Sequence, residues 1–143
     1  MGTVVLDTSV VVALFDPNDA HFLLAQEAVR AHAGSDPDYV VSVIVLAESL
    51  VGAARMGTAG LAHARKAIVE AFGGCREVDM QVALAASVLR AQHAWLRLPD
   101  ALILATAQIE RADVVLTADK RWAKVSDKVQ VVGRDGRRPG RAG

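Results

Sequence analysis

Short apolar runs rich in β-branched residues recur along this chain, and segments with helical spacing separate them. Residues 4–6, 39–41 and 114–117 are apolar at nearly every position, which is typical of strands buried on both faces of a sheet. A run at residues 129–132 and a weaker one at 77–78 bring the expected number of strands to about five. Strands that alternate with helices predict an α/β fold with three layers, in which helices cover both faces of a mainly parallel sheet.

Helices are expected where apolar residues recur every three or four positions after a capping side chain. Asp7, Ser42 and Asp79 are suited to capping helix N-termini, and Gly34 and Gly57 are suited to ending helices. The expected helices cover residues 8–14, 22–33, 43–56, 58–72, 80–92 and 100–111, and one helical turn is expected over residues 120–124. Their alternation with the strands supports the three-layer prediction.

Composition narrows the class of protein. The chain has 143 residues, 52% of them hydrophobic, which suits one domain with a substantial core. We place this domain at residues 1–132 and expect residues 133–143, which are rich in Gly and Arg, to be a flexible tail. Sixteen basic residues balance sixteen acidic ones, so any binding to nucleic acid must depend on local charge.

The single cysteine and the N-terminal sequence bear on location. Cys75 has no second cysteine to pair with inside the chain, which fits a reducing compartment. We find no signal peptide, and no apolar run is long enough to span a bilayer. We therefore expect a cytoplasmic protein that does not contact a membrane.

Four acidic residues stand at or near the ends of the predicted elements. Asp7 directly follows the first strand, Glu48 lies in the helix after the second, and Asp119 follows the strand at 114–117. Functional groups of a parallel sheet collect beyond the carboxyl ends of its strands, so chain order places these three acids at one edge. Asp100 lies in the first turn of a helix, where the helix dipole favours a carboxylate, and it joins the others if that helix docks at the same edge.

Such a cluster of carboxylates predicts a metal site. Clustered carboxylates raise one another's pKa, and a bound divalent cation offsets their repulsion. Carboxylate oxygens without His or Cys are ligands suited to Mg²⁺ or Mn²⁺. One or two such ions can activate water and stabilise a leaving oxygen, which is the chemistry of phosphodiester hydrolysis. We predict that Asp7, Glu48, Asp100 and Asp119 bind the metal and form the catalytic site.

Each acid also has a purely structural interpretation. Asp7 could cap the helix that follows it, Asp100 could interact with a helix dipole, and Asp119 could be a turn residue. Glu48 could be an exposed helix residue, although its neighbours at 43–50 are mostly apolar. The prediction of a site therefore depends on the four acids in combination.

Four segments of the chain resemble the motifs of PIN-domain proteins, and they occur in the same order. They are residues 4–9, which read VVLDTS, residues 45–48, which read VLAE, residues 98–103, which read LPDALI, and residues 116–121, which read LTADKR. The resemblance covers about residues 3–132 and implies a PIN fold and an endoribonuclease that depends on Mg²⁺ or Mn²⁺. Size and motifs look most like the VapC-type toxins of type II toxin–antitoxin systems.

This resemblance implies further properties. VapC-type toxins inhibit growth by cleaving tRNA, rRNA or mRNA, they pair as homodimers, and a small VapB-type antitoxin blocks their site. The resemblance therefore implies a VapB-type antitoxin as the partner of this chain. Hydroxyls at the positions of Ser9 and Thr117 are expected to hold metal-bound water or to orient a carboxylate. Ser9 could instead be a helix cap, and Thr117 an ordinary strand residue.

Basic and aromatic residues near the acidic edge are candidates for binding RNA. Arg97, Lys120 and Arg121 would lie close to the acids in this fold and could hold RNA phosphates, or they could be ordinary surface charges. Trp122 could stack on a base, but packing of its short helical turn is the favoured interpretation.

Other functions predict other patterns. Phosphatases of the haloacid-dehalogenase type place Asp-x-Asp after the first strand, whereas this chain has Asp7-Thr8-Ser9 there. A receiver domain needs a pair of acids that this sequence lacks. A housekeeping RNA-processing nuclease and an inactive PIN-like interaction module remain alternatives. Inactive members usually lack one or more acids, and a small antitoxin gene directly upstream would distinguish a toxin from a housekeeping enzyme.

Overall fold

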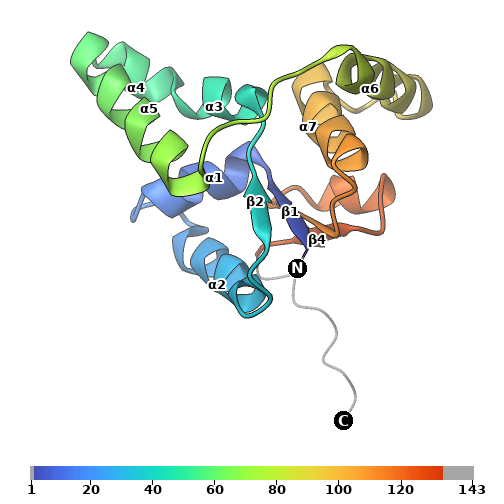
Figure 1. Ribbon diagram of the computed structural model, residues 1–143, viewed down its shortest axis with the longest axis horizontal. Helices are drawn as coiled ribbons and strands as arrows, with labels where there is room; N and C mark the ends of the chain where they lie inside the picture. The colour runs from blue at the N-terminus through green and yellow to red at the C-terminus, as the bar shows by residue number, and fades with distance from the viewer. Residues whose placement is uncertain (1, 134–143) are drawn as a thin grey trace.

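The computed structural model describes residues 2–133 of the chain, and within that range the strands form one parallel sheet (Figure 1). The sheet has the strand order β2-β1-β3-β4. Its strands are β1 (Thr3–Leu6), β2 (Asp38–Val40), β3 (Val114–Thr117) and β4 (Val129–Val131). All three pairings are parallel, with Val5 opposite both Val40 and Val115 in the centre of the sheet. The predicted parallel α/β sheet is confirmed.

The number of strands differs from the prediction, because residues 77–78 do not form one. At that place a single isolated bridge joins Ser42 to Arg76, through hydrogen bonds from Arg76 N to Val41 O and from Val43 N to Arg76 O. The chain has no room to extend this pairing, since Asp79 already caps the next helix by accepting a hydrogen bond from Val82 N. Four short strands therefore replace the expected five within residues 2–133.

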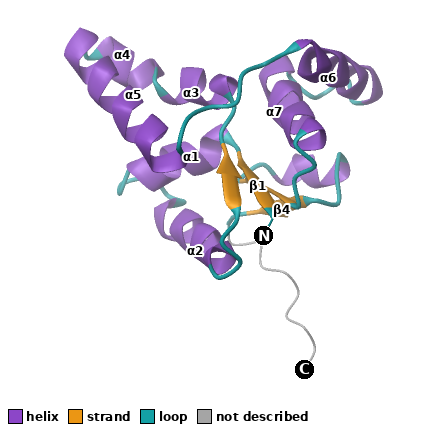
Figure 2. Cartoon of the chain, viewed as in Figure 1, coloured by secondary structure: helices purple, strands orange, loops and turns teal. Residues whose placement is uncertain are grey.

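Helices cover both faces of the sheet, as expected for strands this apolar. The face that carries α7 is opposite the face that carries α1 and α2, while α4 and α5 pack together and extend away from the sheet (Figure 2). The helices are α1 (Thr8–Phe15), α2 (Phe22–Ala33), α3 (Val43–Ser49), α4 (Val51–Arg55), α5 (Thr58–Phe72), α6 (Met80–Gln92) and α7 (Leu98–Ile109), followed by the 3₁₀ helix η1 (Lys120–Lys124).

One expected helix is divided into two. The prediction of a continuous helix over residues 43–56 was wrong, because α3 ends and α4 begins around Leu50. The backbone of Leu50 itself keeps a right-handed conformation (φ −91°, ψ −5°). Val51 and Gly52 follow directly, and both have poor intrinsic helix propensity, which explains a break at this position.

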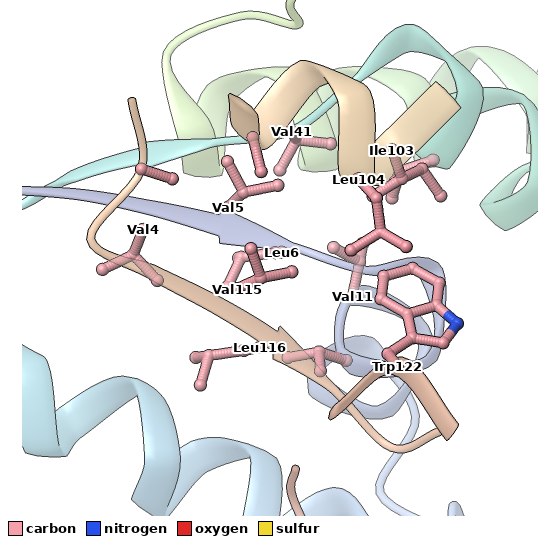
Figure 3. Packing of buried hydrophobic residues seen from close by; sticks show 14 of the residues in the cluster. Val4, Val5, Leu6, Val11, Val41, Ile103, Leu104, Val115, Leu116 and Trp122 are labelled. Carbon is pink, nitrogen blue, oxygen red and sulfur yellow. The ribbon is translucent and has the colours of Figure 1, made fainter. Parts of the chain in front are cut away.

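The hydrophobic core lies between the sheet and its helices (Figure 3). Leu6 and Leu116 are fully buried in adjacent strands, and Leu104 lies on the face of the sheet that α7 covers, where it lines a cavity with Val115. Trp122 of η1 closes the core at the carboxyl end of the sheet, with 1% of its surface exposed. Its burial confirms that Trp122 packs in the core.

Two further observations concern membrane-spanning segments and the C-terminal tail. Among residues 2–133, no helix combines the length and the apolar character needed to cross a membrane. The expected flexible tail begins at residue 133, and residues 134–143 lie outside the part of the chain that the structure describes.

Candidate active site

The four predicted acids line one cavity at the carboxyl edge of the sheet. Asp7 follows β1 and is the N-cap of α1, and Asp119 follows β3 and is the N-cap of η1. Asp100 lies in the first turn of α7, and Glu48 lies in α3. The cavity has a volume of about 230 Å³, and its other lining residues are Thr8, Ser9, Arg97 and Trp122. Docking of α7 therefore brings Asp100 to the edge where chain order places the other three acids.

Asp7 is the most buried of the four carboxylates, with 6% of its surface exposed. Its Oδ1 accepts a hydrogen bond from Thr8 N at 2.7 Å, and its Oδ2 accepts from Ser9 Oγ at 2.8 Å and from Thr117 Oγ1 at 2.7 Å. Burial raises the pKa of Asp7, and it outweighs these three hydrogen bonds, which lower the pKa. Asp7 is thus held in one orientation at a position that disfavours its charge.

The two hydroxyls that hold Asp7 also tie β1 to β3. Ser9 Oγ accepts a hydrogen bond from Ala118 N at 3.0 Å, and Thr117 Oγ1 accepts one from Asp119 N at 3.1 Å. Each hydroxyl donates to Asp7 and accepts from the chain that leads to Asp119. The structure therefore places Ser9 and Thr117 where they orient two of the four acids together.

Replacing Thr117 with Val is expected to weaken Mn²⁺ binding about 10- to 100-fold, the usual cost of losing a hydrogen bond that orients a metal ligand. Val has the shape of Thr but cannot donate to Asp7 or accept from Asp119 N. Thr117→Ser keeps the hydroxyl and is the matched control, expected to bind Mn²⁺ nearly as the wild type does. Isothermal titration with Mn²⁺ measures both variants. Equal affinity in Thr117→Val and Thr117→Ser would assign the hydroxyl no part in the site.

Asp100 and Glu48 line the same cavity and interact electrostatically. Asp100 is 7% exposed, and its pKa is raised mainly by burial, with further contributions from the charges of Glu48 and Asp119. Arg97 opposes this shift, since its Nε lies 3.4 Å from Asp100 Oδ2. Glu48 Oε1 accepts a hydrogen bond from Thr8 Oγ1 at 2.7 Å. Electrostatic repulsion among these carboxylates is the property that a cation would relieve.

Asp119 differs from the other three acids because one guanidinium group donates hydrogen bonds to both of its oxygens. Arg121 Nη2 lies 2.7 Å from Asp119 Oδ2, and Arg121 Nε lies 3.1 Å from Oδ1. These hydrogen bonds lower the pKa of Asp119, although Asp119 faces the same cavity as Asp100, whose pKa is raised. Within one cavity, the direction in which the pKa of a carboxylate shifts therefore depends on its own burial and hydrogen-bond partners.

The donor set suits a hard divalent cation, but the side chains are not arranged as a ready-made metal site. Four carboxylates and no sulfur or imidazole line the cavity, which is the chemistry that Mg²⁺ and Mn²⁺ prefer. No three Asp, Glu, His or Cys side chains within residues 2–133 converge closely enough to hold an ion. Hydrogen bonds to Arg121 occupy both oxygens of Asp119, and one to Thr8 occupies Glu48 Oε1. Arg121 therefore competes with a bound cation for the two oxygens of Asp119.

Replacing Arg121 with Gln is expected to tighten Mn²⁺ binding about two- to five-fold, the range for an exposed ion pair. Arg121 is exposed and competes with a cation for Asp119, so its loss frees the carboxylate. Arg65→Gln, which removes one positive charge from α5, controls for net charge. Titration at several salt concentrations measures the effect. Weaker binding in Arg121→Gln, with Arg65→Gln unchanged, would show that Arg121 supports the site rather than competing with the ion.

The candidate RNA-binding residues lie at different places around the cavity. Arg97 lines the cavity, while Lys120 and Arg121 are exposed residues of η1 beside it. Their contact with RNA stays a prediction. Thr8 has a role that the sequence did not predict, since its hydroxyl donates a hydrogen bond to Glu48, 40 residues further along the chain. The only sequence signal for Thr8 was its position between Asp7 and Ser9.

Comparison with known proteins agrees with this arrangement. The sequence matches the PIN domain family over residues 4–128. The chain belongs to the PIN-domain family. No curated protein sequence matches the chain significantly.

Several solved structures share this PIN fold. A toxin–antitoxin complex from Klebsiella pneumoniae contains a chain that is 27% identical, with a TM-score of 0.68 over 88% of this chain and 94% of that one. VapBC-5 from Mycobacterium tuberculosis, of the VapBC toxin–antitoxin family, is 27% identical, with a TM-score of 0.55 over 92% and 98% of the two chains. FitAcB from Neisseria gonorrhoeae, at 23% identity, has a TM-score of 0.68 over 91% and 96%, which shows the shared fold.

Proposed function

We propose that this PIN-domain protein is a metal-dependent endoribonuclease that hydrolyses RNA phosphodiester bonds. The observation that carries the proposal is the convergence of Asp7, Glu48, Asp100 and Asp119 from four separate elements on one cavity. Two of these acids, Asp7 and Asp100, are buried with raised pKa values. Burying several carboxylates together disfavours their charged forms, so such a set calls for a cationic ligand.

The same four residues would hold one or two Mg²⁺ or Mn²⁺ ions. The chemistry that such an ion supplies at a carboxylate site is activation of water and stabilisation of the leaving oxygen in phosphodiester hydrolysis. Ser9 and Thr117 keep Asp7 oriented toward the cavity, and Thr8 does the same for Glu48. Arg97 has a side chain that is 70% exposed, so it can turn from Asp100 to an RNA phosphate. Lys120 and Arg121 would bind phosphates further along the strand.

We further propose that the protein is the toxin of a toxin–antitoxin pair. Two solved structures at 27% identity are toxin–antitoxin proteins, and the chain covers nearly all of each matched chain. The expected partner is a VapB-type antitoxin that blocks the acidic cavity, and the toxin is expected to act in the cytoplasm as a homodimer. Growth inhibition would follow from cleavage of tRNA, rRNA or mRNA. A housekeeping RNA-processing role is the alternative.

Two experiments test these proposals separately. Purified protein is incubated with total RNA after chelation with EDTA, and then again after Mg²⁺ or Mn²⁺ is restored. Cleavage that stops with EDTA and returns with the metal supports the nuclease, and cleavage that persists in EDTA contradicts metal dependence.

Induced expression of the wild-type gene is expected to arrest growth, and co-expression of an adjacent antitoxin gene is expected to restore it. Active protein that leaves growth unaffected would favour the housekeeping role.

A further inference from the structure

Two aromatic rings lie beside the acidic cavity, and the proposed cleavage reaction assigns no role to them. Trp95 precedes α7 and is 36% exposed, although it is among the largest side chains of the protein. The Arg121 guanidinium carbon lies 5.2 Å from the centroid of the Trp95 ring, and His93 meets that ring edge-on at 6.1 Å between centroids. Large exposed aromatic rings with cationic neighbours are typical of surfaces that bind single-stranded nucleic acid.

Trp95 is connected to the catalytic acids through residues on either side of it. Arg121, which lies over the Trp95 ring, is also the residue that pairs with Asp119. Two positions after Trp95, Arg97 pairs with Asp100 and lines the cavity. The Trp95 ring therefore contacts the arginine of the first pair and lies two residues before the arginine of the second, at the rim of the site.

The loop that carries Trp95 is held in place. Leu96 is fully buried, and its backbone N donates a hydrogen bond to His93 O at 3.0 Å. Arg90 Nε donates to Leu96 O at 2.8 Å, so the next peptide of the loop is held by a side chain of α6. A ring presented by an anchored loop loses little conformational entropy when a ligand binds to it, which favours a binding role.

We propose that Trp95 is a stacking platform for an unpaired nucleobase next to the scissile phosphate. The inference rests on the proposed ribonuclease function and names the side chain that would contact the base beside the cut bond. An unpaired base can stack on the indole while Arg97 and Arg121 hold the adjoining phosphates. Bases within a duplex are already stacked on one another, so the platform selects against double-stranded RNA.

Binding assays with Trp95 variants test the platform. The probe is a fluorescently labelled single-stranded oligoribonucleotide that spans a bond cut by the wild type, and anisotropy is measured in EDTA so that the probe stays intact. Trp95→Ala is expected to weaken binding about 5- to 100-fold, the usual effect of removing one base–aromatic stack. Trp95→Phe retains an aromatic face and is expected to keep most of the affinity. Phe15→Ala removes an exposed aromatic ring from the far end of α1 and is the control.

Abasic probes separate stacking from a merely structural role. The wild type is expected to bind a probe that lacks the base beside the cut bond more weakly than it binds the complete probe. Trp95→Ala is expected to bind the two probes with equal affinity. Such non-additivity shows that the ring and the base contact each other. If base removal costs Trp95→Ala as much as it costs the wild type, the platform is wrong, while the nuclease proposal stands. If the wild type neither binds nor cuts any RNA, the proposed function fails and the platform with it.

Discussion

Replacing Asp7 with Asn is expected to reduce RNA cleavage at least about 100-fold. Asp7 is a proposed metal ligand, and the loss of a ligand costs more than the loss of a residue that orients one. The same change is expected to make the metal-free protein more stable at neutral pH. Asp7 is 6% exposed and its pKa is raised by burial, so its charge is unfavourable in the folded protein. Asn has the same shape, keeps an acceptor for Thr8 N and carries no charge.

The pH dependence of this stability has a definite sign. The pKa of Asp7 in the fold lies above its ordinary value of 3.8. Below about 3.8 the carboxyl is protonated in both the folded and unfolded states and does not oppose folding. As the pH rises through the folded-state pKa, the unfolded state is favoured and stability is lost. The advantage of Asp7→Asn over the wild type should therefore grow with pH across this window and then stay constant.

Denaturant unfolding at several pH values, with EDTA present, measures this advantage. Asp100→Asn is expected to behave in the same way, because the pKa of Asp100 is also raised by burial. Asp127→Asn, at an exposed position after η1, is the control and should change neither activity nor stability. Wild-type cleavage by Asp7→Asn in the presence of Mg²⁺ or Mn²⁺ would overturn the mechanism. A lower free energy of unfolding for Asp7→Asn at neutral pH would contradict the electrostatic account.

Replacing Trp122 with Ala is expected to lower the free energy of unfolding by about 3–5 kcal/mol, the usual cost of truncating a large buried aromatic side chain. Trp122 is 1% exposed and packs near Leu104, Leu116 and Val11 (Figure 3). Its loss leaves a cavity beneath η1, the element that Asp119 caps. Cleavage should therefore fall together with stability.

Two variants show whether packing is the cause of this loss. Trp122→Phe retains most of the ring and is expected to lose much less stability, since the Trp122 Nε1 has no hydrogen-bond partner among the described residues. Trp95→Ala removes the other tryptophan of the chain, which is partly exposed, and should lower stability clearly less than Trp122→Ala does. Urea unfolding compares the midpoints of the variants. A Trp122→Ala protein as stable as Trp95→Ala would contradict the assignment of Trp122 to the core.

The strands that the sequence predicted correctly are those whose signal is local. Residues 4–6 and 114–117 are apolar and β-branched over their whole length, and both form buried central strands. Residues 77–78 are too short a run for strand propensity to decide their structure. They lie between Arg76, which is hydrogen-bonded to Val41 and Val43, and Asp79, which caps the next helix. The sequence gives only a weak signal for the break between α3 and α4 at Leu50. Val51 and Gly52 are poor helix formers, but two such residues lower the stability of a helix only slightly.

The four carboxylates illustrate the division between sequence and tertiary structure. The sequence by itself determined that Asp7 and Asp119 follow strands, because strand periodicity and chain order are local properties that place both at one edge of a parallel sheet. Only the tertiary structure decided that α7 places Asp100 at that edge, and that Asp119 forms an ion pair with Arg121. The physical reason is that such contacts depend on how elements dock and on which rotamers the docked surfaces permit, and local sequence patterns do not encode either.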